Sequence, residues 1–386
     1  MTNDLARIAG RAPGRIEVRE VAATESGAPP PARLSANAEL AARTVDRVLD
    51  VRRRTSSFSG LVAGRRNSPG GEADAMASPI DVRPSDEGLD HDAVGVGVYA
   101  VLSDQVAGES PDEIEGEVVA GETVALADFP AGAAIGTALH SVLEHVDFAR
   151  VADPEQRESM LRELDRHGVA PRWAEHFVAA LPALVEAPLK AESPGLRLAS
   201  IAGTDRIDEM EFIVPVALGV DDRPRGAALS PAALAGVFDR HAASDTLRGY
   251  AARLDQLDFL PLEGFLKGFV DLVFRHEARW HVVDYKSNWL GTDVSDYAPG
   301  KLIGPMIEHD YILQYHLYVL ALHRQLARRL PAYDYDRDMG DVFYLFLRGL
   351  SVSHPIGTGV YRDRPPVELI EALSEIFHGR QLEGVS

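Results

Sequence analysis

Residues 268–286 read GFVDLVFRHEARWHVVDYK, and this stretch determines how the rest of the chain is interpreted. Two runs of β-forming residues, 266–274 and 280–285, flank a short polar group, a pattern that predicts two antiparallel strands joined by a tight turn. The turn is expected at Glu277 and Ala278. Neither residue favours the positive φ angles of a two-residue hairpin turn, so the register is the weak point of this prediction.

The predicted hairpin brings three charged side chains to one face. A turn at its centre places Asp271 opposite Asp284, and strand alternation turns Lys286 to the same side. Opposed residues have Cβ atoms roughly 4.5–5.5 Å apart, so the two carboxylates repel each other unless a cation lies between them. Hard oxygen ligands with room for water and a phosphate suit Mg²⁺. The alternative is a surface hairpin whose Asp and Lys form a solvated ion pair.

Composition limits the class of protein. The chain has 386 residues, of which 46% are hydrophobic, and no cysteine, which fits a reducing compartment and excludes a disulfide scaffold. No apolar run approaches the roughly 20 residues of a membrane span, and the N-terminus lacks a signal core. A cytoplasmic protein with no membrane partner is expected. The net charge of −20 argues against nucleic acid, but about fifteen acidic residues against one base fall within 71–130, so the remainder is only mildly acidic.

Composition also divides the chain into three parts. Residues 1–61 are expected to be the remnant of a preceding region, with a short helix at 37–51. Residues 62–126 are rich in Gly, Ser, Pro, Asp and Glu, which predicts a disordered acidic linker. Residues 127–386 are expected to form the folded domain.

Two further segments carry candidate site residues. Helical spacing after Gly136 predicts an amphipathic helix that holds His140 and Glu144 one turn apart on its polar side. A lone histidine is more often an ordinary surface or core residue. The segment 208–216 is a predicted strand whose Glu209 and Glu211 share a face, where they are either accessory carboxylates or solubilising charges on an edge strand.

The remaining patterns favour an α/β sheet. Residues 154–189 are expected to form two or three helices, and 310–330 one long helix with Gln314 and Tyr318 on the same side. The apolar run 342–347 is typical of a strand buried on both faces. Strand, helix and strand in succession favour a mixed sheet flanked by helices.

Several motifs in order resemble one family. They are His140 in Gly-x-x-x-His-x-x-x-Glu, the block GFVD…VDYKSNWLG, Gln314-Tyr-x-x-Tyr318, and YLFLRG at 344–349. Together they resemble the C-terminal nuclease domains of the RecB family, the β subunits of exodeoxyribonuclease V, in the PD-(D/E)xK superfamily. The resemblance runs from about residue 129 to the C-terminus, with a weaker echo at 55–61.

The resemblance implies a restriction-endonuclease-like core and a metal-dependent nuclease. It assigns Mg²⁺ to His140, Asp271, Asp284 and the backbone carbonyl of Tyr285, and catalysis to Asp284 and Lys286. It also implies that Gln314, Tyr318 and Glu144 support the site or contact DNA.

The resemblance further implies partners and an origin. The substrate is expected to be single-stranded DNA or linear duplex ends, acted on in double-strand-break repair and recombination, with RecC-like and RecD-like subunits and RecA as partners. The phosphate loop of a helicase is absent from this sequence. We therefore expect the nuclease end of such a protein without its motor: a fragment, a split gene product or a start codon inside a longer reading frame. The alternatives are a non-catalytic docking module for RecC or RecA and a non-functional remnant.

Overall fold

The computed structural model describes residues 53–62, 121–218, 227–241 and 244–380. The helix predicted at 37–51 and most of the linker predicted at 62–126 lie outside these ranges.

A long hairpin forms the centre of the sheet. Strands β3 (Glu263–His276) and β4 (Arg279–Lys286) are antiparallel, and the ladder runs from the turn to Leu272 opposite Val283. This is the register predicted from the sequence. Its turn residues, Glu277 and Ala278, have φ angles of 48° and 67°, so the chain adopts the left-handed conformation that these residue types disfavour.

The remaining strands extend the hairpin into a mixed sheet, as predicted. The order is β1-β3-β4-β5-β6, with β2 on the other edge of β3. β1 is parallel to β3 and β4 is parallel to β5, whereas the other pairs are antiparallel. The strands are β1 (Arg53–Ser56), β2 (Arg206–Val216), β5 (Met339–Phe346) and β6 (Val360–Asp363).

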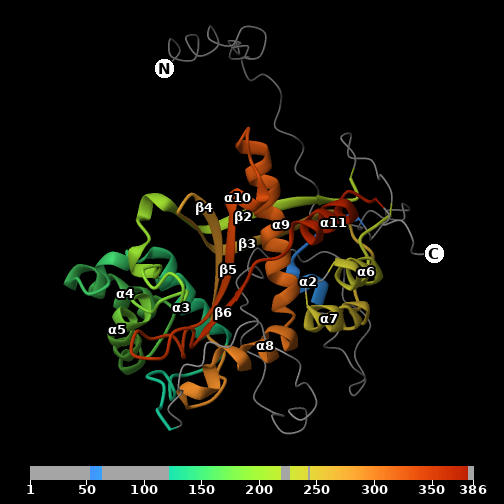
Figure 1. Cartoon of the computed structure of the whole chain (residues 1–386). Helices are drawn as coiled ribbons and strands as arrows, with labels where there is room; N and C mark the ends of the chain where they lie inside the picture. Colours follow the sequence, from blue (N-terminus) through green and yellow to red (C-terminus); the bar gives the residue numbers. More distant parts are fainter. Residues whose placement is uncertain (1–52, 63–120, 219–226, 242–243, 381–386) are drawn as a thin grey trace, which may run out of the picture. The chain divides into compact units, whose positions relative to one another are not determined.

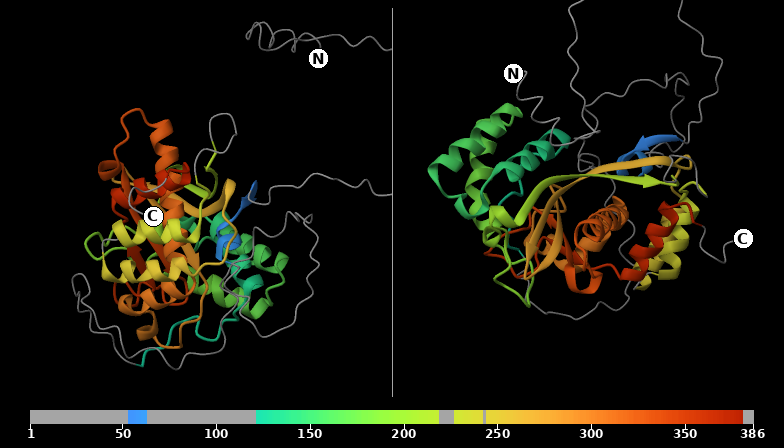
Figure 2. Two further views of the ribbon diagram at one scale, coloured as in Figure 1. Left: turned by 90° about the vertical axis from the view of Figure 1, so that its right-hand side faces the viewer. Right: turned by 90° about the horizontal axis from the view of Figure 1, so that it is seen from above.

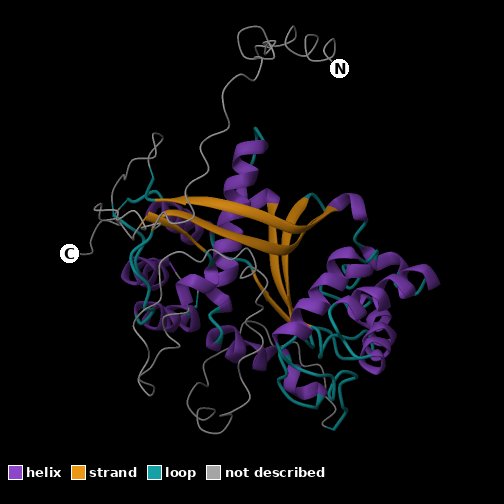
Figure 3. Ribbon diagram, turned by 180° about the vertical axis from the view of Figure 1, so that it is seen from behind, coloured by secondary structure: helices purple, strands orange, loops and turns teal. Residues whose placement is uncertain are grey.

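Helices cover both faces of the sheet (Figures 1 and 3). One face packs on α3 (Ala133–His145), α4 (Pro154–Arg166) and α5 (Pro171–Val185). The other packs on α2 (Phe58–Val62), α6 (Pro231–His241), α7 (Asp245–Asp255), α8 (Pro299–Glu308), α9 (Tyr311–Arg329) and α11 (Val367–Phe377). The short helix α10 (Tyr335–Asp338) precedes β5.

Strand β5 is buried on both faces, as its apolar sequence predicted. Val342, Tyr344 and Phe346 belong to one core cluster, whereas Phe343 and Leu345 belong to the other. The connection from β4 to the parallel β5 contains α8 and α9, as a parallel pair requires a crossover.

Strand β3 has two different edges. β2 pairs along almost its whole length on one edge, whereas β1 pairs with 263–266 and β4 with 272–276. Among the described residues, no strand lies between β1 and β4 beside residues 267–271. Figure 2 shows β2 and β3 curving strongly across the sheet. The gap between β1 and β4 is where the candidate site lies.

The segment 53–62 differs from its expected place in a preceding region. It adds β1 and α2 to this sheet, with Phe58, Leu61 and Val62 buried in the core. The Arg54 guanidinium fastens it by donating to the carbonyl of Leu260 at 2.7 Å. The pairing joins parts of the chain far apart in sequence, so no local pattern indicated it.

Within the described ranges, no helix has the length and apolar character needed to cross a membrane.

Candidate functional site

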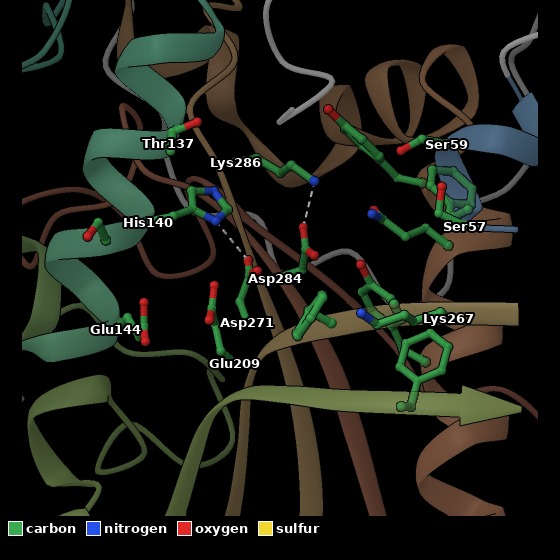
Figure 4. Close-up of a pocket in the computed structure, with 18 of the residues that line it drawn as sticks. Ser57, Ser59, Thr137, His140, Glu144, Glu209, Lys267, Asp271, Asp284 and Lys286 are labelled. Atoms are coloured by element: carbon green, nitrogen blue, oxygen red, sulfur yellow. Dashed lines mark ion pairs between the residues drawn. The ribbon is translucent and has the colours of Figure 1, made fainter. Parts of the chain in front are cut away.

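A cavity of about 430 Å³ opens in the gap between β1 and β4. Its walls come from α3, β2, β3, β4, α9 and the turn after β1, meaning here Ser57 and the first residues of α2 (Figure 4). It brings together most of the predicted site residues: His140, Glu144, Glu209, Asp271, Asp284, Lys286, Gln314 and Tyr318.

Helix α3 carries the imidazole. Leu139, Val142 and Leu143 are buried against the sheet, so His140 and Glu144 lie along the side that borders the cavity. Nδ1 of His140 is 3.4 Å from Oδ2 of Asp271 (Figure 4). The amphipathic spacing seen in the sequence therefore aims the histidine at the hairpin.

Asp271 links the two strands of the hairpin where they separate. Its Oδ2 accepts a hydrogen bond from the backbone N–H of Tyr285 at 2.8 Å. This bond lies one step beyond the last ladder pair, Leu272 with Val283. The carboxylate is thus fixed beside the end of β4, next to Asp284.

Asp284 and Lys286 form a buried ion pair. Nζ of Lys286 lies 2.6 Å from Oδ2 of Asp284, and each side chain is only 3% exposed. The ammonium also lies 4.0 Å from the ring centroid of Tyr311, a cation–π contact. Burial raises the pKa of Asp284 to about 8; Lys286 opposes this rise, and repulsion from Asp271 adds to it.

Tyr285 places its side chain away from these charges. The ring is buried in the cluster beneath α3, α4 and α5, with an edge contact to His140 at 5.9 Å between centroids. This is the alternation expected of a strand that sends Asp284 and Lys286 to the other face. The role of its carbonyl remains a prediction.

The two glutamates of β2 differ in their relation to the cavity. Glu209 lines the cavity, whereas Glu211 lies outside the lining and its Oε1 is 3.2 Å from Nζ of Lys267. Glu209 has a φ of 47°, and the ladder between β2 and β3 lacks a pair at this residue, between those of Asp208 and Met210. Burial, together with the nearby carboxylate of Glu209, raises the pKa of Glu144.

Helix α9 supplies the polar wall opposite α3. Gln314 and Tyr318 lie one turn apart and both line the cavity. Oε1 of Gln314 accepts a hydrogen bond from the hydroxyl of Tyr344 at 2.9 Å. The ring of Tyr318 meets Phe212 edge to face, with centroids 5.8 Å apart. These contacts hold both side chains at the cavity.

Arg348 fixes the entry of α3 against the end of β4. Its guanidinium donates to the carbonyls of Ser287, Leu126, Phe129 and Pro130 at 2.8–2.9 Å. The side chain is buried. It therefore sets the position of the helix that carries the histidine relative to the strand that carries the carboxylate.

The sequence interpretation missed several lining residues, including Ser57, Ser59, Thr137 and Lys267. A signal for Lys267 was present, because it precedes Asp271 by four residues on the same predicted strand. Ser57 and Ser59 had only the echo at 55–61, and nothing local connected them to the hairpin.

The residues at this site have the chemistry of a hard-cation site. Two carboxylates and an imidazole converge on one cavity, and the mutual repulsion of Asp271 and Asp284 is what a bound cation would reduce. Among the described residues, no three His, Asp or Glu side chains already gather as a coordination group. Asp284 contacts Lys286, and Asp271 contacts His140 and the Tyr285 amide. The donor set fits a divalent metal bound by oxygen and nitrogen.

Comparison with known families agrees with this geometry. Residues 120–381 match the family model of the PD-(D/E)XK nuclease superfamily. The chain belongs to that superfamily.

Several curated proteins similar to this chain are named RecBCD enzyme subunit RecB. The chain is 35% identical over 350 residues to the Escherichia coli K12 protein, and this match covers 90% of this chain and 25% of that protein. It is 35% identical over 315 residues to the Mycobacterium tuberculosis H37Rv protein, and this match covers 75% of this chain and 28% of that protein. It is 36% identical over 251 residues to the Haemophilus influenzae protein, and this match covers 65% of this chain and 19% of that protein. The chain thus spans about a quarter of the length of these relatives.

Proposed function

We propose that the chain hydrolyses phosphodiester bonds of DNA as a Mg²⁺-dependent nuclease of the RecB type, with exonuclease or endonuclease activity. The observation that carries this proposal is the buried pair of Asp284 and Lys286, 2.6 Å apart, beside Asp271 in an open cavity. Burying two charged side chains costs free energy, because both lose their contact with water, and this pair is only 3% exposed. A surface ion pair would avoid that cost, so a function at the site is the reason that we give for the burial.

The predicted ligands of Mg²⁺ are His140, Asp271, Asp284 and the backbone carbonyl of Tyr285. When bound, the ion would stabilise negative charge on the reacting phosphate and lower the pKa of a coordinated water. Asp271, fixed by the Tyr285 amide, positions one carboxylate, and Asp284 positions the other.

Lys286 is proposed to orient the attacking water and favour loss of its proton. Its ammonium is held at one point by Asp284 and by the Tyr311 ring. A positioned group of this kind contributes a rate factor of roughly 10²–10⁴.

Gln314, Tyr318 and Glu144 are proposed to support the site and contact DNA. Gln314 is fixed by Tyr344, and Glu144 borders the cavity on α3. Glu209 and Glu211 are proposed as accessory carboxylates, Glu209 at the cavity wall and Glu211 through Lys267.

The wider role follows from the named relatives. We infer that the chain degrades single-stranded DNA or linear duplex ends in the cytoplasm during repair and recombination. RecC-like and RecD-like subunits are proposed partners because the relatives are named as subunits of the RecBCD enzyme. RecA is proposed from the sequence resemblance alone. We place the start of the folded domain near residue 120 instead of 127, because Val124 and Leu126 are buried in its core. The segment 53–62 also belongs to the domain, since it joins the sheet.

The deciding experiment is digestion of labelled linear single-stranded DNA by the purified chain. We expect cleavage with Mg²⁺, none with EDTA, and background activity for Asp284→Asn, because the isosteric amide removes a metal-binding charge while keeping the volume of the buried side chain. Asp153→Asn is the matched control, since Asp153 pairs with Arg150 outside the cavity. Wild-type cleavage rates from a folded Asp284→Asn protein would refute the proposal.

Substitution of Lys286 separates its role from metal binding. Lys286→Gln should lower cleavage by about 100-fold or more. Calorimetric titration with Mg²⁺ should show affinity within a few-fold of wild type, because no ligand is lost. An equal loss of metal affinity and activity would show that Lys286 acts through the metal site instead.

A further inference from the structure

The cavity is divided by charge. Asp271, Glu144 and Glu209 lie toward α3, whereas Lys267 lies at the other end, beside the turn after β1 (Figure 4). Asp284 and Lys286 lie between these ends. A negatively charged strand that spans the cavity would meet carboxylates at one end and a cation at the other.

Lys267 comes from the part of β3 that lies between β1 and β4. Its side chain is 26% exposed, with Nζ 3.2 Å from Glu211 and 5.2 Å from the ring centroid of Phe269. The carboxylate is itself 51% exposed, so this ion pair is a weak one that a stronger anion can replace.

Ser57 and Ser59 lie at the same end because β1 runs parallel to β3. The pairing of Ser56 with Leu266 brings the next residues of both segments to the cavity. Oγ of Ser57 accepts a hydrogen bond from the Gly60 amide at 3.2 Å, which orients the hydroxyl and leaves its proton to be donated. Phe58, the first residue of α2, lies between the two serines and is buried in the core, which anchors this segment.

We propose that Lys267, Ser57 and Ser59 form a second subsite that binds a backbone phosphate of the DNA strand beside the one that is cleaved. This inference rests on the proposed nuclease function. Non-bridging phosphate oxygens accept hydrogen bonds from hydroxyl and ammonium donors, and these three side chains provide such donors at one end of the cavity, where a phosphate would compete with the exposed carboxylate of Glu211 for Lys267. The subsite draws the strand across the cavity, so that the adjacent phosphodiester reaches Asp271 and Asp284.

The test is binding of a short fluorescein-labelled oligothymidylate, with and without a 5′-phosphate, in an Asp284→Asn background with Mg²⁺. We expect Lys267→Gln to weaken binding about 10-fold and to reduce the salt-dependence slope by about 0.7, the value for one lost contact to single-stranded DNA. Ser57→Ala with Ser59→Ala should weaken binding about 5-fold. A loss for both oligonucleotides assigns the subsite to an internal phosphate, and a loss for the phosphorylated one alone assigns it to a terminal phosphate.

Two further variants distinguish a phosphate contact from a structural effect. Glu211→Gln removes the competing carboxylate and should tighten binding about 2- to 5-fold. Lys301→Gln is the matched control, because Lys301 also pairs with one carboxylate, Asp296, at 3.1 Å but lies outside the cavity lining.

If Lys267→Gln binds as tightly as Lys301→Gln, with an unchanged salt slope, while the chain with native Asp284 still cleaves DNA, the subsite is refuted and the nuclease proposal stands. If the native chain neither binds nor cleaves the oligonucleotide, both are refuted.

Discussion

Within the part of the chain that the structure describes, His316 on α9 is fully buried and no charged side chain contacts it. Its Nδ1 is 2.7 Å from the carbonyl of Ile312, and its ring packs on Phe238 and Tyr315. Burial lowers its pKa to about 3 from an ordinary 6.5. An unfolded chain therefore binds this proton below pH 6.5 while the folded chain does not, so stability is present above pH 6.5 and is lost as the pH falls toward 3.

The prediction is that His316→Leu flattens this dependence. Below pH 6.5 the unfolding free energy of the wild type should fall faster than that of the variant, by up to about 1.4 kcal/mol per pH unit. Urea unfolding of both proteins at pH 7.5, 6 and 5 measures the difference. Parallel profiles would show that His316 takes up no proton on unfolding in this range.

Single residues also show which parts of the candidate site could be predicted from the sequence. Alternation along one strand placed Asp284 and Lys286 on the same face, and the structure brings them 2.6 Å apart. The same rule could have found Lys267, four residues before Asp271. Alternation also named Glu209 as a candidate, and Glu209 lines the cavity, but a φ of 47° at a glutamate has no local signal in the sequence.

At the scale of elements, the β3–β4 turn is strained by its sequence. Glu277 and Ala278 both adopt positive φ, a conformation that costs a non-glycine residue roughly 1–2 kcal/mol. Glu277→Asn with Ala278→Gly should raise the unfolding free energy by roughly 0.5–1 kcal/mol after the entropy that glycine adds to the unfolded chain. Gly168→Ala is the reciprocal control, because it places a non-glycine residue at a φ of +74°, where an added Cβ meets no atom within 4 Å and only the backbone conformation opposes the change. Urea midpoints that stay unchanged for the hairpin variant would show that the turn is not strained.

Elements also differ in how well sequence specifies them. The hairpin, α3, α9 and β5 follow from short-range patterns of alternation and helical spacing, and each appears where it was predicted. β1 is too short to show a pattern, and its identity as a strand depends on pairing with 263–266. The phosphate subsite proposed above depends on that same pairing, which explains why its serines were missed.

At the scale of the whole molecule, the family match and the folded unit have different limits. The match covers residues 120–381, yet the sheet also contains β1 and its core contains residues of α2. Gly264 shows how close this contact is: its φ is +131°, and a Cβ there would lie 2.3 Å from the carbonyl oxygen of Arg54. The segment 53–62 is therefore part of the domain, although a long stretch of sequence separates it from the rest.

The corresponding prediction compares chains that begin at residues 53 and 63. Phe58, Leu61 and Val62 are buried, and each buried side chain of this size is worth roughly 1.5–3 kcal/mol before the entropy of ordering the segment is subtracted. The chain 63–386 should therefore unfold at a lower urea concentration than 53–386, and should bind the oligothymidylate more weakly than Lys267→Gln alone, because it loses both serines and the strand beside Lys267. Equal urea midpoints for the two chains would show that β1 and α2 add nothing to the stability of the sheet. Equal affinity of the two chains for the oligothymidylate would show that Ser57 and Ser59 do not contribute to DNA binding.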